Sequence, residues 1–362
     1  MAVLAGIALL ASLPAAVAAL PVSAPGVGVA QLQQQIAQSS SHAYSGYAES
    51  DGGLALPVTG GQFTSLTDLL GGQSQLRVWW RTGTDWRVDQ LNLAGETDVH
   101  ADADGTWTWN YESNRATITN PPVRAQVRLP VAADLLPPEL GRRLLSQATV
   151  AELSPLAPQR IAGRDAVGLR LRPSDQASMI DHVDVWADVA TSIPLRVAVY
   201  AKGSASPGIS SSFLDFSADS PAASTTAFTV PAGARVQSSD GDDLASIINR
   251  FGGGVPPPAL LGVSRNALLG QVGAIGVYGR GVTEFIAAPL PGRLAGSLHD
   301  QLQKAPGVST TPAGLSISVG PLSLLLTNRA GQGRYWLLIG TVTDARLAAA
   351  AAELADYRGP TG

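Results

Sequence analysis

The sequence predicts an α+β protein in which a long antiparallel β-sheet is followed by a small α+β domain. Three observations lead to this fold class. From residue 42 onward, short runs alternate between apolar and polar residues and are separated by Gly, Asp, Asn and Pro, which is typical of antiparallel strands with one covered face. Helix-like segments are few, and the last of them is rich in alanine. At 362 residues, the chain is long enough for about two domains.

The first predicted domain begins with a polar helix or linker at residues 31–40. Alternation then predicts strands at residues 44–49, 75–81, 86–93, 106–111, 167–172, 182–187, 195–200 and 212–216. The dipeptide Asp104-Gly105 predicts a hairpin turn before Trp107. A short helix is expected at residues 66–70, and residues 132–153 are expected to hold one or two short helices that plug an open sheet.

Glycine and proline indicate a linker over residues 237–262, which includes the runs Gly252-Gly253-Gly254 and Pro256-Pro257-Pro258. Beyond it, strands are expected at residues 274–278, 284–288, 315–319, 322–327 and 335–342. Helices are expected at residues 294–303 and 343–357, the second with Asp344 near its N-terminus. The predicted organisation is an N-terminal segment (1–27), a larger domain (28–236), the linker (237–262) and a smaller domain (263–358).

The N-terminal segment predicts a location outside the cytoplasm. The first formal charge is Glu49, and residues 1–20 are almost wholly apolar, which is about the length that crosses a bilayer. The run Ala16-Val17-Ala18-Ala19 matches an export-peptidase site, although no positive charge precedes it. A cleaved signal peptide and a retained membrane anchor both fit, whereas prolines argue against a buried helix. We expect a periplasmic or cell-envelope protein, secreted or anchored by this segment.

Composition narrows the classes of partner and chemistry. The net charge is −4 and only 14% of residues are charged, with no basic stripe, which argues against nucleic acid as a partner. Cysteine is absent, so the chain has no disulfide, no thiolate zinc site and no cysteine nucleophile of its own. An exported domain without disulfides must be stabilised by its hydrophobic core.

The nearest approach to a metal motif is Asp98-x-His100-x-Asp102-x-Asp104-Gly105, which resembles the first half of a calcium loop. A strict calcium loop would place His100 at the first ligand position and Tyr111 at the bidentate Glu position, so a solvated hairpin turn is the favoured interpretation. No nucleophile elbow, P-loop or HExxH pattern occurs. The sequence therefore predicts no catalytic residue, no metal site and no cofactor, and a protein that is not an enzyme.

Aromatic residues gather in one part of the chain. Five of the seven tryptophans lie between Trp79 and Trp109. Trp107, Trp109 and Tyr111 are spaced at i, i+2 and i+4, which places their rings on one face of a strand. Three large rings side by side either close a core or line an apolar pocket, and the spacing alone leaves both open.

Several short tracts resemble LolA-type lipoprotein carriers and RseB/MucB-like proteins. Residues 76–111 are similar to the central hairpins of LolA-type carriers, with a DG turn followed by tryptophans. Residues 161–173 (IAGRDAVGLRLRP) resemble a signature that both groups share. Residues 183–197 are similar to their V-x-V-W-V-D and P-L-R strand pair, and residues 228–234 (FTVPAGA) resemble the run that closes the module. The resemblance covers about residues 42–236.

The resemblance implies an open, strongly curved antiparallel half-barrel that encloses short helices and holds acyl chains in an apolar cavity. Burying each methylene is worth about 0.8 kcal/mol, so such a cavity needs no catalytic group. Alternation along the strands then selects the candidate ligand-binding residues, which are Trp79, Trp107, Trp109, Tyr111, Val185 and Val197. In the smaller domain, residues 276–287 and 336–343 resemble the second domain of RseB-like regulators. The chain keeps Gly340 and Val342 of that family's V-G-E-V-P type turn but lacks its Glu and Pro.

Three functions follow from these observations. The leading hypothesis is an extracytoplasmic protein, carrier or sensor, whose partner is an acyl lipid or a lipoprotein. The second is an RseB-like regulatory protein that docks on a membrane-bound anti-sigma factor. The third is an exported hydrolase. A cleaved N-terminal segment would free a carrier, whereas a retained one would hold a sensor at the membrane.

Overall fold

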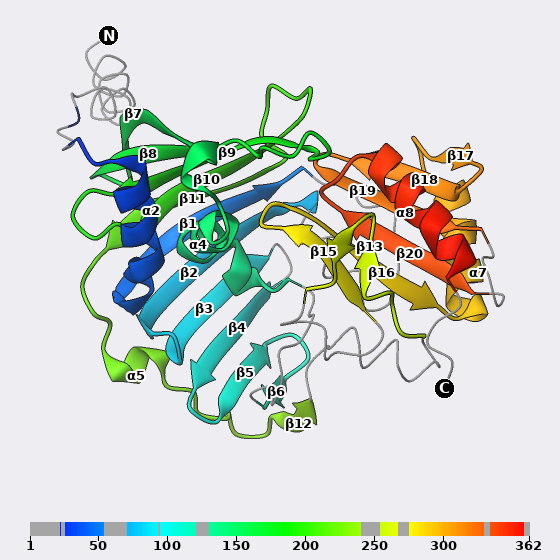
Figure 1. Cartoon of the computed structure of the whole chain (residues 1–362). Coiled ribbons are helices and arrows are strands. Elements are labelled where there is room, and N and C mark those ends of the chain that lie inside the picture. Colours follow the sequence, from blue (N-terminus) through cyan, green and yellow to red (C-terminus); the bar gives the residue numbers. More distant parts are fainter. Residues whose placement is uncertain are drawn as a thin grey trace, which may run out of the picture.

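A computed structural model describes residues 22, 26–53, 71–92, 95–120, 130–239, 254–266, 275–328 and 334–357. Two sheets, of twelve and six strands, form the body of these residues (Figure 1). Most of the predicted N-terminal segment and the helix predicted at residues 66–70 lie outside the described residues. Among the described helices, none is long and apolar enough to span a bilayer.

The larger sheet is antiparallel except at one edge. Its strands are β1 (Tyr44–Gly52), β2 (Gln73–Thr82), β3 (Asp85–Asn92), β4 (Gly95–Asp102), β5 (Gly105–Asn110), β6 (Arg115–Thr119), β7 (Leu153–Ile161), β8 (Arg164–Leu171), β9 (Ile180–Asp188), β10 (Pro194–Ala201), β11 (Ile209–Ser217) and β12 (Arg235–Ser239). Their order is β12-β6-β5-β4-β3-β2-β1-β11-β10-β9-β8-β7, and β12–β6 is the one parallel pair among these described strands. Because the two end strands do not pair with each other, the described sheet is open.

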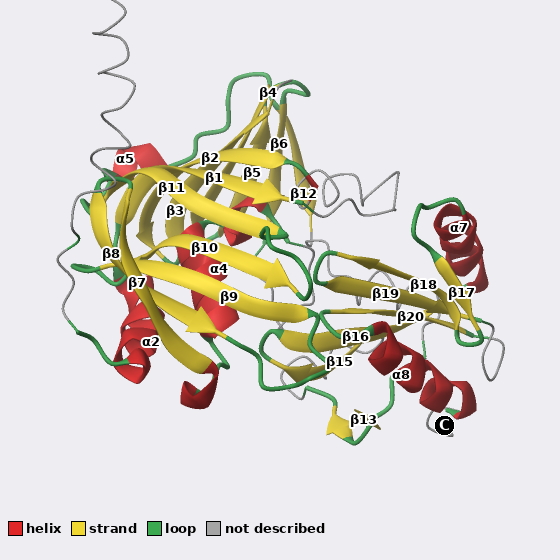
Figure 2. Cartoon of the chain, turned by 90° about the horizontal axis from the view of Figure 1, so that it is seen from above, coloured by secondary structure: helices red, strands yellow, loops and turns green. Residues whose placement is uncertain are grey.

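The curved sheet encloses short helices on one side, which we call the inner face (Figure 2). These elements are α2 (Val29–Gln38), the 3₁₀ helices η1 (Ser39–Ser41), η3 (Ala132–Leu135) and η4 (Val150–Glu152), and α4 (Pro137–Leu145). Prolines open α4, where a missing N–H costs nothing. Gly141 lets α4 approach β10, because a Cβ there would lie 3.0 Å from side-chain atoms of Pro194. The predicted fold class, an open curved sheet around short helices, is confirmed.

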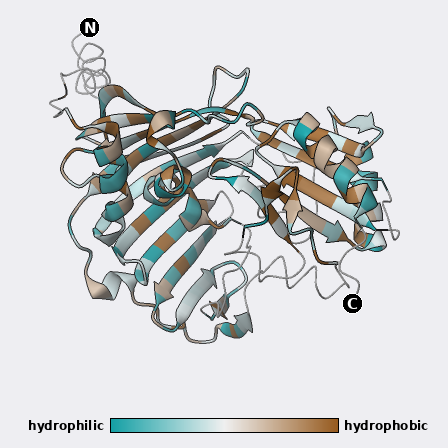
Figure 3. Cartoon of the chain, in the orientation of Figure 1, coloured by the Kyte–Doolittle hydropathy of each residue, from teal (hydrophilic) through white to brown (hydrophobic). Residues whose placement is uncertain are grey.

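The inner face is filled by two clusters of buried side chains. The first joins α2 and α4 to β8, β9 and β10 through Leu32, Ile36, Leu145, Leu169, Val185 and Val197. The second is aromatic and lies beneath η3. In it, the Tyr44 and Trp80 rings stack at 5.8 Å and the Trp80 and Trp86 rings at 5.2 Å, beside Phe213 and Phe216. Figure 3 shows the alternation of hydrophobic and hydrophilic residues along these strands.

The opposite side, the outer face, is crossed by the chain between β11 and β12. This segment contains α5 (Ala223–Thr226), where His100 Nδ1 donates to the Thr226 carbonyl at 2.8 Å. The Phe228 ring then lies 5.0 Å from His100 and 5.3 Å from Trp107. Beyond it, residues 235–239 pair with β6, although composition places most of them in the predicted linker.

The smaller sheet has the order β15-β16-β20-β19-β18-β17. Its elements are β15 (Gly276–Arg280), β16 (Thr283–Leu290), α7 (Gly292–Gln303), β17 (Ser309–Thr311), β18 (Gly314–Val319), β19 (Leu322–Thr327), β20 (Tyr335–Gly340) and α8 (Asp344–Asp356). Leu325 packs in the cluster with α8, and the next residue, Leu326, packs in the cluster with α7. Because successive strand residues face opposite ways, the two helices cover opposite faces of this sheet.

A separate two-stranded ribbon before β15 packs on the smaller domain. It consists of β13 (Ala259–Leu260) and β14 (Val263–Ser264). Leu260 is buried against the α8 cluster, and the Tyr278 hydroxyl donates to the Pro257 carbonyl at 2.6 Å. The end of the segment that composition indicates as a linker is therefore packed on the second domain.

Candidate functional site at the domain junction

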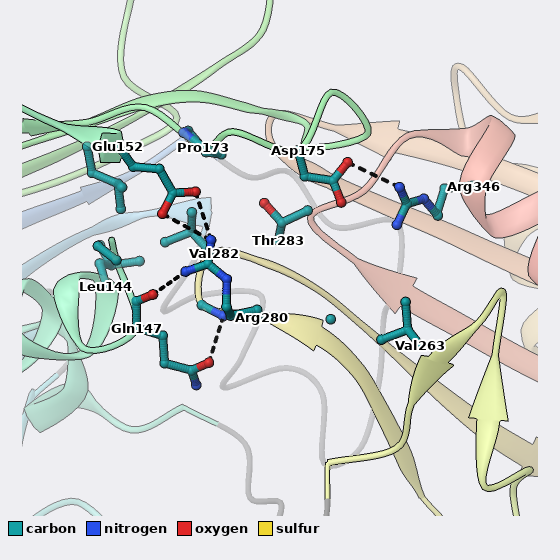
Figure 4. Close-up of a pocket in the computed structure, with 14 residues that line it drawn as sticks. Leu144, Gln147, Glu152, Pro173, Asp175, Val263, Arg280, Val282, Thr283 and Arg346 are labelled. Atoms are coloured by element: carbon teal, nitrogen blue, oxygen red, sulfur yellow. Dashed lines mark hydrogen bonds and ion pairs between the residues drawn. The ribbon is translucent and has the colours of Figure 1, made fainter. Parts of the chain in front are cut away.

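A cavity of about 220 Å³ lies where the two sheets meet (Figure 4). Five parts of the chain form its walls: the corner between α4 and β7, the segment from the end of β8 to Asp175, β14, the β15–β16 hairpin, and α8. The lining residues are Leu144, Gln147, Ala148, Glu152, Leu171, Pro173, Asp175, Val263, Gly279, Arg280, Gly281, Val282, Thr283 and Arg346.

Glu152 is the most strongly held side chain of the junction. Its carboxylate accepts hydrogen bonds from the backbone N–H and hydroxyl of Thr149, at 2.9 and 2.8 Å, in a capping box at the N-terminus of η4. It also accepts from the backbone N–H and hydroxyl of Ser174, at 3.0 and 2.8 Å. From the second domain, Arg280 Nη2 donates to both carboxylate oxygens at 2.9 and 3.0 Å.

These bonds determine the charge of Glu152. The residue is 8% exposed, and desolvation by itself raises the pKa of its carboxyl. The hydrogen bonds from Thr149 and Ser174 oppose this effect and together hold the pKa well below its ordinary value. The carboxylate is therefore ionised at neutral pH, and it provides a fixed negative charge for Arg280, whose side chain is 48% exposed.

The β15–β16 hairpin is shaped to reach this corner. Gly279 and Gly281 flank Arg280 with φ of 116° and 61°, backbone conformations that favour glycine. Gly281 N–H donates to Gln147 Oε1 at 3.2 Å, and the Arg280 guanidinium also donates to the Gln147 carbonyl. The conformation of the turn thus places Arg280 against the first domain.

A second set of contacts joins the domains on the other side of the cavity. Arg346 Nη2, from α8, donates to Asp175 Oδ1 at 3.1 Å. Met179 N–H donates to the Thr341 carbonyl, and Thr343 N–H donates to the Ala177 carbonyl, both at 2.8 Å. The cavity is consequently lined by two positive and two negative charges around apolar side chains, and it favours an uncharged or dipolar group over a free ion.

The structure divides the six residues predicted to bind ligand between the two faces of the sheet. Trp79 and Trp107 lie in one cross-strand row with Arg87 and His100, and Trp109 lies opposite Asp98. This is the outer face, because their neighbours along the strands, including Val78 and Val88, point to the inner cluster. Tyr111 follows β5, is exposed and contacts the Trp109 ring edge-on at 5.5 Å.

Val185 and Val197 lie on the inner face and are fully buried under α2 and α4. None of the six lines the junction cavity. Alternation shows which residues of one strand share a side, but it does not show which side faces the helices. The ligand-binding roles of these six residues stay predictions.

The hairpin prediction at Asp104-Gly105 is confirmed. Asp102 Oδ1 accepts from the backbone N–H groups of Asp104 and Gly105, at 2.8 and 3.0 Å, between β4 and β5. Both aspartates of this turn are exposed, whereas Asp98 and His100 are buried farther along β4. Asp102 and Asp104 therefore belong to a solvent-exposed hairpin turn.

Sequence reasoning missed the residues of the junction. The capping box Thr149-x-x-Glu152 and the turn Gly279-Arg280-Gly281 are each visible as local signals. Their contact joins positions 128 residues apart, and neither signal points to the other.

No protein-family model and no curated protein matches the sequence. Solved structures do match. The crystal structure of MucB in complex with MucA(peri) has a TM-score of 0.50 at 15% identity, over 89% of this chain and 97% of that chain. The complex structure of Pseudomonas aeruginosa MucA/MucB has a TM-score of 0.51 at 15% identity, over 93% and 100%. A LolA superfamily protein from Nitrosomonas europaea has a TM-score of 0.24 at 12% identity, over 56% and 99%.

The likeness to MucB extends over both sheets, since it covers nine-tenths of this chain. At 15% identity it concerns the fold and leaves the activity open. The resemblance to RseB/MucB-like proteins that the sequence indicates is confirmed at this level, and the chain has a MucB-like fold.

Proposed function

We propose that this chain is an extracytoplasmic sensor that docks on a membrane-bound regulator of the anti-sigma-factor type. The observation that carries the proposal is the likeness to MucB, a protein solved in complex with MucA, over 93% of this chain and the whole of that one. The role is binding rather than catalysis. The N-terminal segment, if retained, would hold the sensor at the membrane beside its partner.

The junction supports this role physically. Cavities between domains are common binding sites, and a partner segment that touches both walls senses how the domains are placed. Opposed charges around Leu144, Leu171 and Val282 suit a peptide, which offers backbone dipoles and an apolar side chain together. We therefore place the partner's segment at this cavity.

Photo-crosslinking in the native host tests the proposal. A photoreactive p-benzoylphenylalanine at Val263, which lines the cavity, is expected to capture one membrane-spanning protein. The same group at Val236, exposed on the edge strand β12, serves as the control and is expected not to capture it. Capture of the same proteins from both positions, or of no membrane protein from Val263, would contradict docking at the junction.

A second candidate function, binding of an acyl lipid or lipoprotein, rests on a different observation. The Tyr44 hydroxyl and Trp80 Nε1 are buried in the aromatic cluster and have no hydrogen-bond partner among the described residues. Both are donors, and buried donors of this kind normally find an acceptor. The ester or carboxyl oxygen of an acyl chain would supply one in apolar surroundings.

Palmitate binding followed by tryptophan fluorescence tests this candidate. Trp80→Phe keeps an aromatic side chain but removes the N–H donor, so we expect it to weaken palmitate binding by roughly 5–10-fold, the worth of one hydrogen bond. Trp79→Phe, one residue away on the outer face, is expected to leave the affinity unchanged. If no acyl lipid accompanies the purified protein in native mass spectrometry and palmitate leaves its fluorescence unaltered, the acyl-binding function is wrong.

A further inference from the structure

Three carboxylates converge on the outer face of the larger sheet, where β3 pairs with β4. Asp89 lies directly opposite Asp98, and Glu96 precedes Asp98 by two residues on the same side of β4. One oxygen of each lies within 4.8 Å of the others. Asp89 and Asp98 are buried, so this cluster is set into the sheet rather than spread over its surface.

Arg87 neutralises only part of this charge. Its Nε and Nη2 donate to the two oxygens of Asp89 at 2.6 and 2.7 Å, and Nη2 lies 3.2 Å from Asp98 Oδ2. His100, next to the cluster, has its pKa lowered by burial. Arg77 faces Asp89 from β2 but is exposed, and no ion pair joins it to these three carboxylates among the described contacts. When all three carboxylates are ionised, they and the Arg87 guanidinium sum to a charge of −2.

A second observation is independent of the clustering. Asp98 is 3% exposed, yet its Oδ1 has no hydrogen-bond donor among the described residues. Its carboxyl group lies beside that of Glu96. A buried carboxylate oxygen without a donor is costly, so this atom indicates a missing positive partner.

We propose that Asp89, Glu96 and Asp98 bind a hard divalent cation of the calcium type. All three offer oxygen, the ligand that such cations prefer, and Ca²⁺–O bonds of about 2.3–2.6 Å allow one ion to touch oxygens up to about 5 Å apart. A charge of +2 offsets the net −2 of the cluster. Arg87 can keep its contacts, because each carboxylate oxygen has a second lone pair.

This site is distinct from the calcium-like motif in the sequence. Of that motif, Asp98 alone belongs to the cluster, since Asp102 closes the β4–β5 turn through its own backbone contacts. Asp89 enters from the neighbouring strand. Asp102→Asn is therefore a matched control, because it removes one carboxylate from the same strand without touching the proposed ligands.

Terbium luminescence tests the proposal on the purified chain. Tb³⁺ replaces Ca²⁺ and emits when a nearby tryptophan transfers energy to it, and Trp109 lies directly opposite Asp98. We expect saturable emission that Ca²⁺ displaces, and a rise in the unfolding midpoint of about 2–4 °C at tenfold excess of Ca²⁺ over its Kd. Asp98→Asn and Glu96→Gln should each weaken binding at least about tenfold, whereas Asp102→Asn should not.

Two results would overturn the site. One is an unfolding midpoint that Ca²⁺ leaves unchanged, which would mean that the Asp98 carboxyl is protonated in the folded protein and binds no cation. The other is Tb³⁺ emission that persists in Asp98→Asn and Glu96→Gln at unchanged affinity, which would place the ion elsewhere. Because Glu96 is only half-buried, its variant still reports on the site if Asp98→Asn fails to fold.

Discussion

Replacing Glu152 with alanine is expected to destabilise the protein by about 3–5 kcal/mol, the range found when one partner of a buried ion pair is removed. The change takes away the acceptor of Thr149, Ser174 and Arg280 at once. It also removes the cap of η4. In differential scanning calorimetry the unfolding midpoint should fall by roughly 5–15 °C, with the two domains unfolding in separate transitions.

The control for this prediction is an exposed ion pair on neighbouring strands. Arg172 lies 4.0 Å from Asp181 with both side chains in solvent, so Arg172→Ala should change stability by less than about 0.5 kcal/mol. Acid provides a further check. Because the folded pKa of Glu152 is depressed, its stabilisation is present above its ordinary pKa of 4.5 and is lost as pH falls below that value. The difference between wild type and Glu152→Gln should therefore shrink from pH 6 to pH 3, and a constant difference would contradict this role.

Replacing Phe213 with alanine is expected to cost about 3–5 kcal/mol of unfolding free energy, because it opens a cavity in the aromatic cluster. Phe213 is 1% exposed and packs edge-on against Tyr44 at 6.0 Å. The next residue, Leu214, is 54% exposed on the same strand, so Leu214→Ala should cost less than about 0.5 kcal/mol. Urea unfolding measures both variants. Equal losses of unfolding free energy in the two variants would mean that the aromatic cluster is not the centre of the inner core.

Most of the larger sheet could be predicted because apolar and polar residues alternate along most of its strands. Each strand predicted between residues 44 and 216 is present, and the hairpin at Gly105 lies where its turn dipeptide indicates. Alternation did not predict β4, β6, β7 and β12, although the turn at Gly105 implies a strand before it. β7 contains Pro155 and Pro158, which an edge strand tolerates but which obscure alternation, and β12 is a short, exposed strand at the start of a Gly- and Pro-rich stretch.

The candidate sites could not be predicted in the same way, since they depend on pairing between distant positions. Glu152 and Arg280 meet only when the domains are in place. Asp89 meets Asp98 only through the β3–β4 register, and a one-residue shift of either strand would turn its carboxylate to the other face. The same holds for the tryptophans. Their spacing predicts that they lie on one side of the strand, but not whether that side faces the helices.

The position of the smaller domain along the larger sheet has a mechanical consequence. Its contacts with Glu152, Asp175 and Met179 lie beside β7, β8 and β9, at one end of the strand order, whereas β12 forms the other edge. A change in the bend of the sheet that moves this end must therefore carry the smaller domain with it or break the Arg280–Glu152 ion pair.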